Sequence, residues 1–128
     1  MGFQSATDSE LKILETLWEM GRPAGFGELM ESVNQRAGTE WKKETLNTFL
    51  SRMQRKKLIE AVEGENKRKK YRPCISRDEY LTEMSKDFLD RNLGGSLAKM
   101  FTALSGGGRL CREDVQELRQ ALDDWEKE

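Results

Sequence analysis

Short polar side chains and one arginine cluster within residues 45–52. Hydroxyl, carboxamide and guanidinium groups pair with base edges in the major groove of DNA, and here they are supplied by Thr45, Asn47, Thr48 and Arg52. Residues 43–57 contain one carboxylate, Glu44, whereas an ordinary solvated helix face mixes both signs of charge. Glu44 would either accept a hydrogen bond from cytosine N4 or pair with a nearby lysine. We expect this segment to bind DNA, together with Lys42 and Lys43 before it.

A run of four cations follows at Lys67, Arg68, Lys69 and Lys70. Cations of this kind bind the phosphate backbone beside a groove, although such runs are also common in solvated loops. Residues 42–72 carry eleven basic and four acidic side chains, while the whole chain has a formal net charge of −1. This concentration of basic charge beside residues 45–52 favours double-stranded DNA as the partner.

Several kinds of chemistry are excluded by the residues that the chain lacks. It has no histidine, and its only cysteines are Cys74 and Cys111. A Ser-His-Asp system, a Cys2His2 zinc site and a CxxC pair are therefore impossible. We expect no enzyme activity, no cofactor and no metal, and we expect Cys74 to be a small buried hydrophobe.

The location of the chain follows from its hydropathy pattern. No run of 18 apolar residues is present, so we expect no membrane insertion. The N-terminus lacks the basic and apolar regions of a secretory signal, and the two cysteines form no disulfide framework. These features predict a cytoplasmic protein.

The elements that position the polar segment can be placed from periodicity and caps. A capping box from Thr7 to Glu10 begins a helix that ends near Gly21. Further helices are expected over residues 26–36 and 43–57, followed by strands over 58–62 and 67–73. Three helices followed by a β-hairpin form a winged helix-turn-helix, in which the third helix reads the major groove. We therefore predict a mostly α fold with a small β-hairpin.

The C-terminal part consists of amphipathic helices without a core of their own. We expect a helix after Ser76, a short helix after Ser96 and a last helix after Cys111. Their apolar faces have too few partners within 128 residues, so we predict a homodimer. We expect a DNA-binding domain over residues 1–74 and a helical dimerisation domain over residues 75–128. The expected interface residues are Tyr80, Leu81, Met84, Phe88, Leu89, Leu97, Met100, Phe101, Leu104, Val115, Leu118, Leu122 and Trp125.

Several strings resemble the penicillinase repressors (BlaI/MecI-like winged-helix transcriptional repressors). Residues 7–18 resemble the opening helix of that family, and 41–53 resemble its recognition helix. The family pattern Thr-x-x-Thr-x-x-x-Arg-Leu occurs here with one difference, which is Met53 at its last position. Residues 71–73, 79–81, 88–89 and 94–97 resemble the end of its wing and parts of its dimerisation helices. The resemblance covers roughly residues 7–125.

The resemblance implies a homodimeric bacterial repressor on a palindromic operator, with interlocking C-terminal helices. It also implies derepression by proteolysis in the C-terminal region, through a membrane-bound sensor protease that responds to β-lactams. The family is commonly cut at an Asn-Phe bond, which this sequence lacks, and the corresponding bond falls near Ala103-Leu104. Copper-responsive relatives carry CxC pairs, and this chain has none.

A second function class remains open on the residues alone. A winged helix can serve as a protein-interaction adaptor that uses its basic face for an acidic partner. DNA binding and this alternative differ in salt dependence, because counterion release makes DNA binding weaken steeply as the salt concentration rises.

Overall fold

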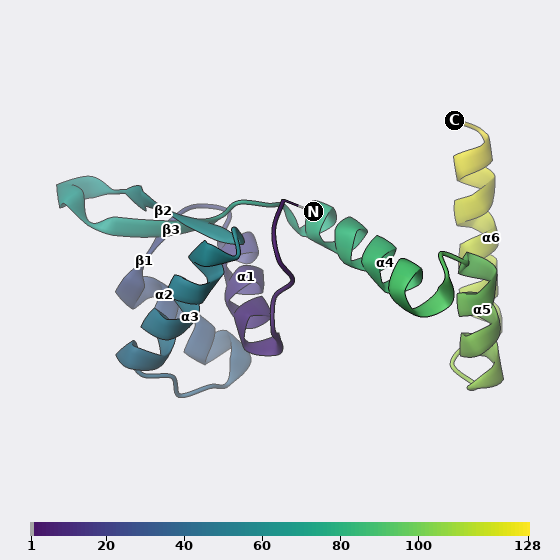
Figure 1. Ribbon diagram of the computed structural model, residues 1–128, viewed down its shortest axis with the longest axis horizontal. Coiled ribbons are helices and arrows are strands. Elements are labelled where there is room, and N and C mark those ends of the chain that lie inside the picture. The colour runs from purple at the N-terminus through teal and green to yellow at the C-terminus, as the bar shows by residue number, and fades with distance from the viewer. Residues whose placement is uncertain (1) are drawn as a thin grey trace. The chain divides into compact units, whose positions relative to one another are not determined.

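The computed structural model describes residues 2–128, which form two compact units divided after Met84 (Figure 1). The first unit contains α1 (Asp8–Met20), α2 (Phe26–Ala37) and α3 (Lys43–Arg55). It also contains β1 (Ala24–Gly25), β2 (Ile59–Glu63), the 3-10 turn η1 (Glu65–Lys67) and β3 (Lys69–Pro73). Helix α4 (Arg77–Leu93) runs from the first unit into the second, which holds α5 (Leu97–Gly106) and α6 (Arg112–Glu126). The predicted winged helix-turn-helix is confirmed.

The ends of the helices follow local chemistry. At α1, the Thr7 hydroxyl accepts from the Glu10 N–H at 3.2 Å, and Glu10 Oε1 accepts from the Thr7 N–H at 2.9 Å. Gly21 ends this helix with a φ of 67°, a conformation that costs glycine little. Helix α3 ends at Arg55 rather than at residue 57, because Lys57 has a φ of 65° and turns the chain into β2.

The sheet has three antiparallel strands in the order β1-β3-β2. Tyr71 of β3 lies opposite Ala61 of β2 on one side and Ala24 of β1 on the other. The two-residue strand β1 was not predicted, since it has no alternating pattern and exists only through its pairing with β3. The hairpin of β2 and β3 forms the wing.

One hydrophobic core holds the first unit together. The helical stripes predicted from periodicity are buried, with Leu14 and Leu17 of α1 and Leu46 and Leu50 of α3 at most 1% exposed. Burial of side chains of this size is worth about 1.5–3 kcal/mol each. The rest of the core is made of Ile13, Ala24, Leu29, Val33, Met53, Leu58, Ile59, Tyr71 and Tyr80.

The first turns of α4 belong to this core. The Tyr80 side chain is buried beside the rings of Phe3 and Trp18, each with its centroid 5.8 Å away. The Tyr80 hydroxyl accepts from the Ala6 N–H at 3.1 Å, and Trp18 Nε1–H donates to the Ile75 carbonyl at 2.9 Å. The compact units therefore divide after Met84, further along the chain than the boundary expected after residue 74.

The second unit consists of the end of α4 with α5 and α6. Ser96 begins α5 as predicted, and its hydroxyl accepts from the Lys99 N–H at 3.1 Å. At the start of α6, the Cys111 N–H donates to Asp114 Oδ2 at 3.0 Å. Within the described part of the chain, no helix is long and apolar enough to cross a membrane.

Candidate nucleic-acid interface

The polar segment predicted to bind DNA forms one exposed face of α3. Leu46, Leu50 and Met53 hold the opposite face in the core. This leaves Lys42, Lys43, Thr45, Asn47, Thr48 and Arg52 exposed. The Thr48 hydroxyl donates to the Glu44 carbonyl at 3.0 Å, which leaves its oxygen free to accept a hydrogen bond. The helix thus presents donors, acceptors and a guanidinium to solvent on one side.

The carboxylate of Glu44 lies on the same face. Its side chain is exposed, and among residues 2–128 no ion pair joins it to a lysine. Of the two roles considered for Glu44, pairing with a nearby lysine is therefore not seen in the structure. A free carboxylate at the start of a cationic helix face can accept a hydrogen bond from cytosine N4.

The wing carries the four predicted cations at and beside its tip. Lys67, Arg68 and Lys69 are exposed, and Lys70 is half-buried. Lys67 lies in the turn η1 with a φ of 59° rather than in the second strand, where it was expected. The stem of Lys70 lies against Gly64, where an added Cβ would come within 2.9 Å of Lys70 Cγ. The stem of Lys70 is thereby packed against the residue that follows β2.

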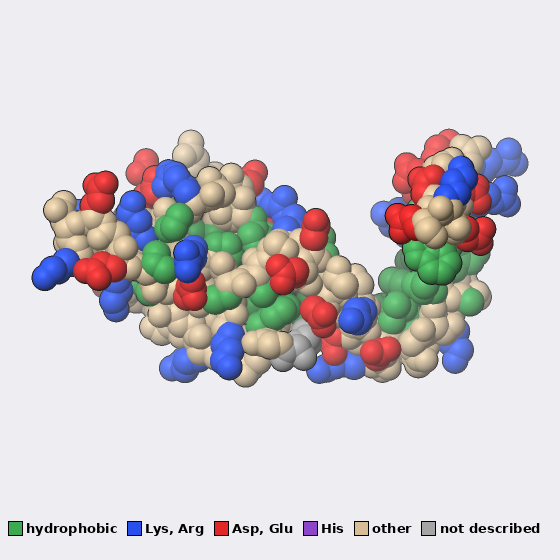
Figure 2. Space-filling view, turned by 90° about the horizontal axis from the view of Figure 1, so that it is seen from above, with side chains coloured by type: hydrophobic (Ala, Val, Ile, Leu, Met, Phe, Trp, Pro, Cys, Tyr) green, Lys and Arg blue, Asp and Glu red, His purple; other side chains and the backbone are tan. Residues whose placement is uncertain are grey.

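Carboxylates are interspersed with these cations. Glu63 of β2 is the register partner of Lys69, and Glu65 lies in the turn at the tip. Figure 2 shows acidic and basic side chains together on the projecting wing, at the left of the view. The wing is therefore less uniformly cationic than the run at 67–70 alone indicates.

A hollow separates the wing from the start of α2. It is lined by Phe26 and Gly27 at that start, and by Arg68, Lys69 and Lys70 of the wing. The N-cap of α2 is Gly25, which offers no side-chain oxygen to the first backbone N–H groups. Such uncapped N–H groups beside cations favour an anion. The sequence did not indicate this hollow, because it depends on the pairing of β1 with β3.

Glu28 is the acidic residue that lines this hollow near α2. Hydrogen bonds from Arg22 hold the pKa of Glu28 below its usual value, and the distance from Arg22 Nη2 to Glu28 Oε2 is 2.5 Å. The pair places a guanidinium beside the carboxylate, which offsets its charge near the hollow.

Two residues lie elsewhere than the sequence indicated. Lys56 is one of the cations of residues 43–57, which were expected to form an exposed cationic helix, but its ammonium is 2.6 Å from Glu10 Oε1 and only 17% of the side chain is exposed. The fully buried Glu10 is half of a capping box, and that local motif gave no sign of a distant partner. Cys74 is exposed rather than buried, because it follows the end of β3.

The residues predicted to form the dimer interface fall into three groups. The prediction for Tyr80 is wrong, since its side chain is buried within the core of the first unit, and Met84 packs against the same core. Leu89, Met100 and Val115 are half-buried. In the described chain, every large apolar side chain that is exposed lies from residue 81 onward, and Figure 2 shows such side chains gathered on the C-terminal helices at the right. They are Leu81, Phe88, Leu97, Phe101, Leu104, Leu118, Leu122 and Trp125.

The predicted cleavage position lies near the end of α5. Ala103 and Leu104 are both exposed. Their carbonyls accept from the N–H groups of Gly107 and Arg109 at 3.2 and 3.1 Å. The bond between them is therefore at the surface but within hydrogen-bonded backbone.

Comparison with known proteins places the chain in a family. The chain matches the family described as "Penicillinase repressor" over residues 6–124. The penicillinase repressor of Bacillus licheniformis is 25% identical over 118 residues, which is 92% of this chain and 89% of that protein. The fold resembles the solution structure of the Bacillus licheniformis BlaI monomeric form in complex with the blaP half-operator. That likeness has a TM-score of 0.51 and 19% identity, and it covers 61% of this chain and 90% of that one. The family match spans nearly all of the sequence, and the chain belongs to the penicillinase repressor family.

Proposed function

We propose that the chain is a DNA-binding transcriptional repressor. The observation that carries this proposal is the exposed face of α3, which bears hydrogen-bonding groups and a guanidinium, in the same unit as a wing that carries exposed cations. Membership of a repressor family supports it, as does the likeness to a relative whose structure is in complex with a half-operator. No enzyme activity is part of the proposal.

The two parts of this surface have different tasks. Helix α3 enters the major groove, where Thr45, Asn47, Thr48 and Arg52 contact base edges. Phosphate contacts come from Lys42 and Lys43 and from the wing at Lys67, Arg68, Lys69 and Lys70. The hollow between the wing and α2 offers backbone N–H groups to a further phosphate.

The repressor acts as a homodimer on a palindromic operator. The exposed apolar side chains from residue 81 onward need a partner, and a second copy of the chain provides the same surface. The first unit, which includes the first turns of α4, binds the half-site, and the helical segment after Met84 holds the two subunits together. Linking two half-site contacts raises the affinity for the whole palindrome through effective concentration.

Derepression follows from removal of the last helix. A cut at Ala103-Leu104, brought about by a membrane-bound sensor protease system, would release α6 with Val115, Leu118 and Leu122. The loss of these side chains would weaken the dimer and with it the hold on the palindrome. The exposure of Ala103 and Leu104 supports this position for the cut.

Selection of duplexes from a randomised DNA pool by the full chain tests the proposal. We expect a palindromic sequence to emerge, and its affinity to fall steeply and linearly on a log–log plot against salt concentration. A chain that enriches no sequence, and that binds DNA no better than it binds an acidic protein, would instead be a protein-interaction adaptor.

A further inference from the structure

Helix α3 is held at both ends by side chains outside its exposed face. We propose that Asn34 and Glu10 are positioning residues, which set the orientation of α3 and thereby the sequence preference of DNA binding. The inference rests on the proposed function, since it takes α3 as the element that contacts base edges.

Asn34 of α2 fixes the start of α3. Its Oδ1 accepts from the Trp41 backbone N–H at 2.9 Å and from the Thr39 hydroxyl at 2.8 Å. Its Nδ2 donates to the Trp41 carbonyl at 3.1 Å. Trp41 immediately precedes the N-cap Lys42, which forms no side-chain cap of its own. One carboxamide therefore forms hydrogen bonds with both the N–H and the carbonyl of Trp41, just before α3 begins.

The ring of Trp41 extends this attachment to the body of α3. Its centroid lies 4.9 Å from that of Phe49, one of the half-buried side chains of the helix. Asn34 thus holds the backbone of Trp41 while the ring of Trp41 packs on α3. A change at Asn34 would release the loop together with the first turn of the helix.

Glu10 of α1 fixes the other end. Its side chain is fully buried, and Oε1 accepts from Lys56 Nζ at 2.6 Å and from the Thr7 N–H at 2.9 Å. Lys56 is the residue directly after α3, and its carbonyl accepts from the Gln4 N–H at 3.0 Å. A buried carboxylate that loses its cation is strongly unfavourable, so the pair resists movement of this end.

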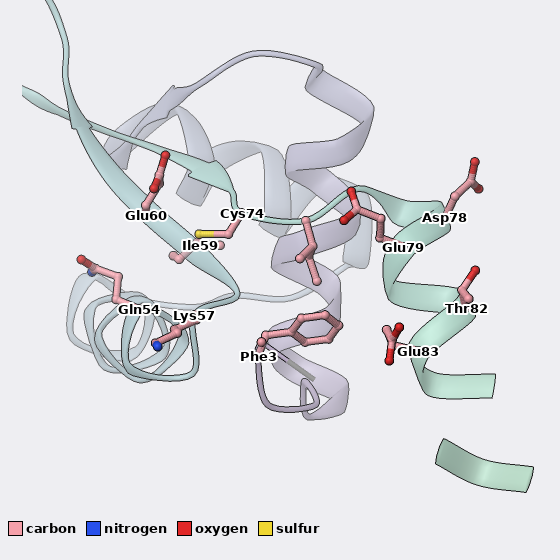
Figure 3. A pocket seen from close by; sticks show the side chains of 12 residues that line it. Phe3, Gln54, Lys57, Ile59, Glu60, Cys74, Asp78, Glu79, Thr82 and Glu83 are labelled. Atoms are coloured by element: carbon pink, nitrogen blue, oxygen red, sulfur yellow. The ribbon is translucent and has the colours of Figure 1, made fainter. Parts of the chain in front are cut away.

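The N-terminal segment encloses the same end of α3. In Figure 3, Gln54 and Lys57 lie at the end of α3, and Phe3 lies between these two residues and Glu83 of α4. These residues line one cavity of the first unit. A displacement of the end of α3 would therefore have to move residues 3–6 as well.

Orientation matters more for base contacts than for phosphate contacts. Hydrogen bonds weaken steeply when distance and angle depart from their optimum, and base edges are fixed in the groove. Lysine side chains on the wing are flexible and act as point charges on the backbone. Loosening α3 should therefore lower the affinity for a preferred site while leaving non-specific affinity nearly unchanged.

The test compares two affinities in full-length variants. The probes are a duplex carrying the half-site that the wild-type chain selects from a random pool, and a scrambled duplex of the same length and composition. The variants are Asn34→Ala and Glu10→Gln. The control is Thr16→Ala, which removes a hydrogen bond of 2.8 Å within α1 from a side chain that is 3% exposed. All titrations are made well below the thermal unfolding midpoint of each variant.

We expect the ratio of the two affinities to fall at least about fivefold in Asn34→Ala and in Glu10→Gln, as for the removal of one base-reading side chain. The ratio in Thr16→Ala should match that of the wild type, although its unfolding midpoint falls. Unchanged ratios in both variants would overturn the inference and leave the proposed function intact. A wild-type chain that prefers no duplex would overturn the proposed function and the inference with it.

Discussion

At the scale of single residues, Thr48 and Arg52 lie four positions apart on the exposed face of α3 and so project from the same side of the helix. We predict that Thr48→Ala and Arg52→Ala each weaken binding to the selected operator by about 1–3 kcal/mol, because each removes a side chain that reads a base edge. Their affinity for scrambled DNA should change much less. Fluorescence titrations on the two duplexes measure both effects.

Changes in the wing should lower the affinity for all DNA sequences rather than the preference for the operator. Changing both Lys69 and Lys70 to Ala should weaken binding similarly for all sequences. The slope of log affinity against log salt concentration should become shallower by about 0.9 for each phosphate that the wing no longer neutralises. If the wing variant altered sequence preference more than the α3 variants did, this division of roles would be wrong.

Glu10 gives the stability of the first unit a dependence on pH. Burial by itself would raise the pKa of Glu10, but hydrogen bonds from Lys56 and Thr7 together with the charge of Lys56 outweigh it and lower the pKa. A carboxyl whose pKa is lower in the folded state stabilises the fold above its unfolded-state pKa. That contribution is lost as the pH falls through its folded-state pKa.

We therefore predict that Glu10→Gln lowers the free energy of unfolding near neutral pH. At acidic pH, the free energy of unfolding of this variant should depend less steeply on pH than that of the wild type, so that the acid limb of the profile is flatter. The control is Glu40→Gln, at an exposed position. Urea unfolding at a series of pH values gives both profiles. Parallel acid limbs for Glu10→Gln and the wild type would show that the ion pair does not contribute in this way.

At the scale of elements, the caps set where helices begin. Thr7→Ala removes the hydroxyl that accepts from the Glu10 N–H, and we predict a loss of about 1 kcal/mol in the stability of the first unit. Ser96→Ala removes the equivalent bond to Lys99 at α5 in the second unit. Hydrogen exchange of core amides in the first unit should respond to Thr7→Ala and not to Ser96→Ala. Equal responses to both would contradict the division into two units.

The sequence predicts most of the elements because their signals are local. The capping boxes at Thr7 and Ser76 and the apolar stripe of α3 each depend on residues within one or two turns. β1 depends instead on residues 70 and 71, far along the chain, so its two residues carry no signal of their own. The end of α3 was placed two residues late because a left-handed lysine at 57 is not a residue that usually ends a helix.

The residues that a buried side chain contacts are harder to predict from the sequence than the fact that it is buried. Periodicity indicates that Tyr80 faces inward, but it does not say whether the neighbour is another subunit or the same chain. The structure places Tyr80 against Phe3 and Trp18. The ion pair of Glu10 and Lys56 was missed for the same reason, since its partners are 46 positions apart. The exposed groups on α3 could be predicted, because their chemistry lies within one helix.

At the scale of the whole molecule, the proposed dimer depends on the apolar side chains of the C-terminal helices. Leu122 of α6 is 53% exposed and lines an apolar groove with Leu97 and Phe101 of α5. We predict that Leu122→Glu shifts the chain from dimer to monomer in sedimentation velocity at micromolar concentration. Gln116→Glu adds the same charge to an exposed polar position of α6 and should leave the dimer intact. A wild-type chain that sediments as a monomer would remove the dimer from the account.

The most direct test of the account is a titration of one intact palindrome with the full chain and with a truncation that ends at Ala103. The truncation lacks α6 but keeps α3 and the wing. We predict that it stays folded over its first 74 residues, becomes largely monomeric and retains its affinity for an isolated half-site. Its affinity for the palindrome should fall by a factor of about 10² or more, which is the avidity that the dimer supplies. Equal affinities of the two proteins for the palindrome would show that α6 does not hold the dimer, and would contradict the proposed mechanism of derepression.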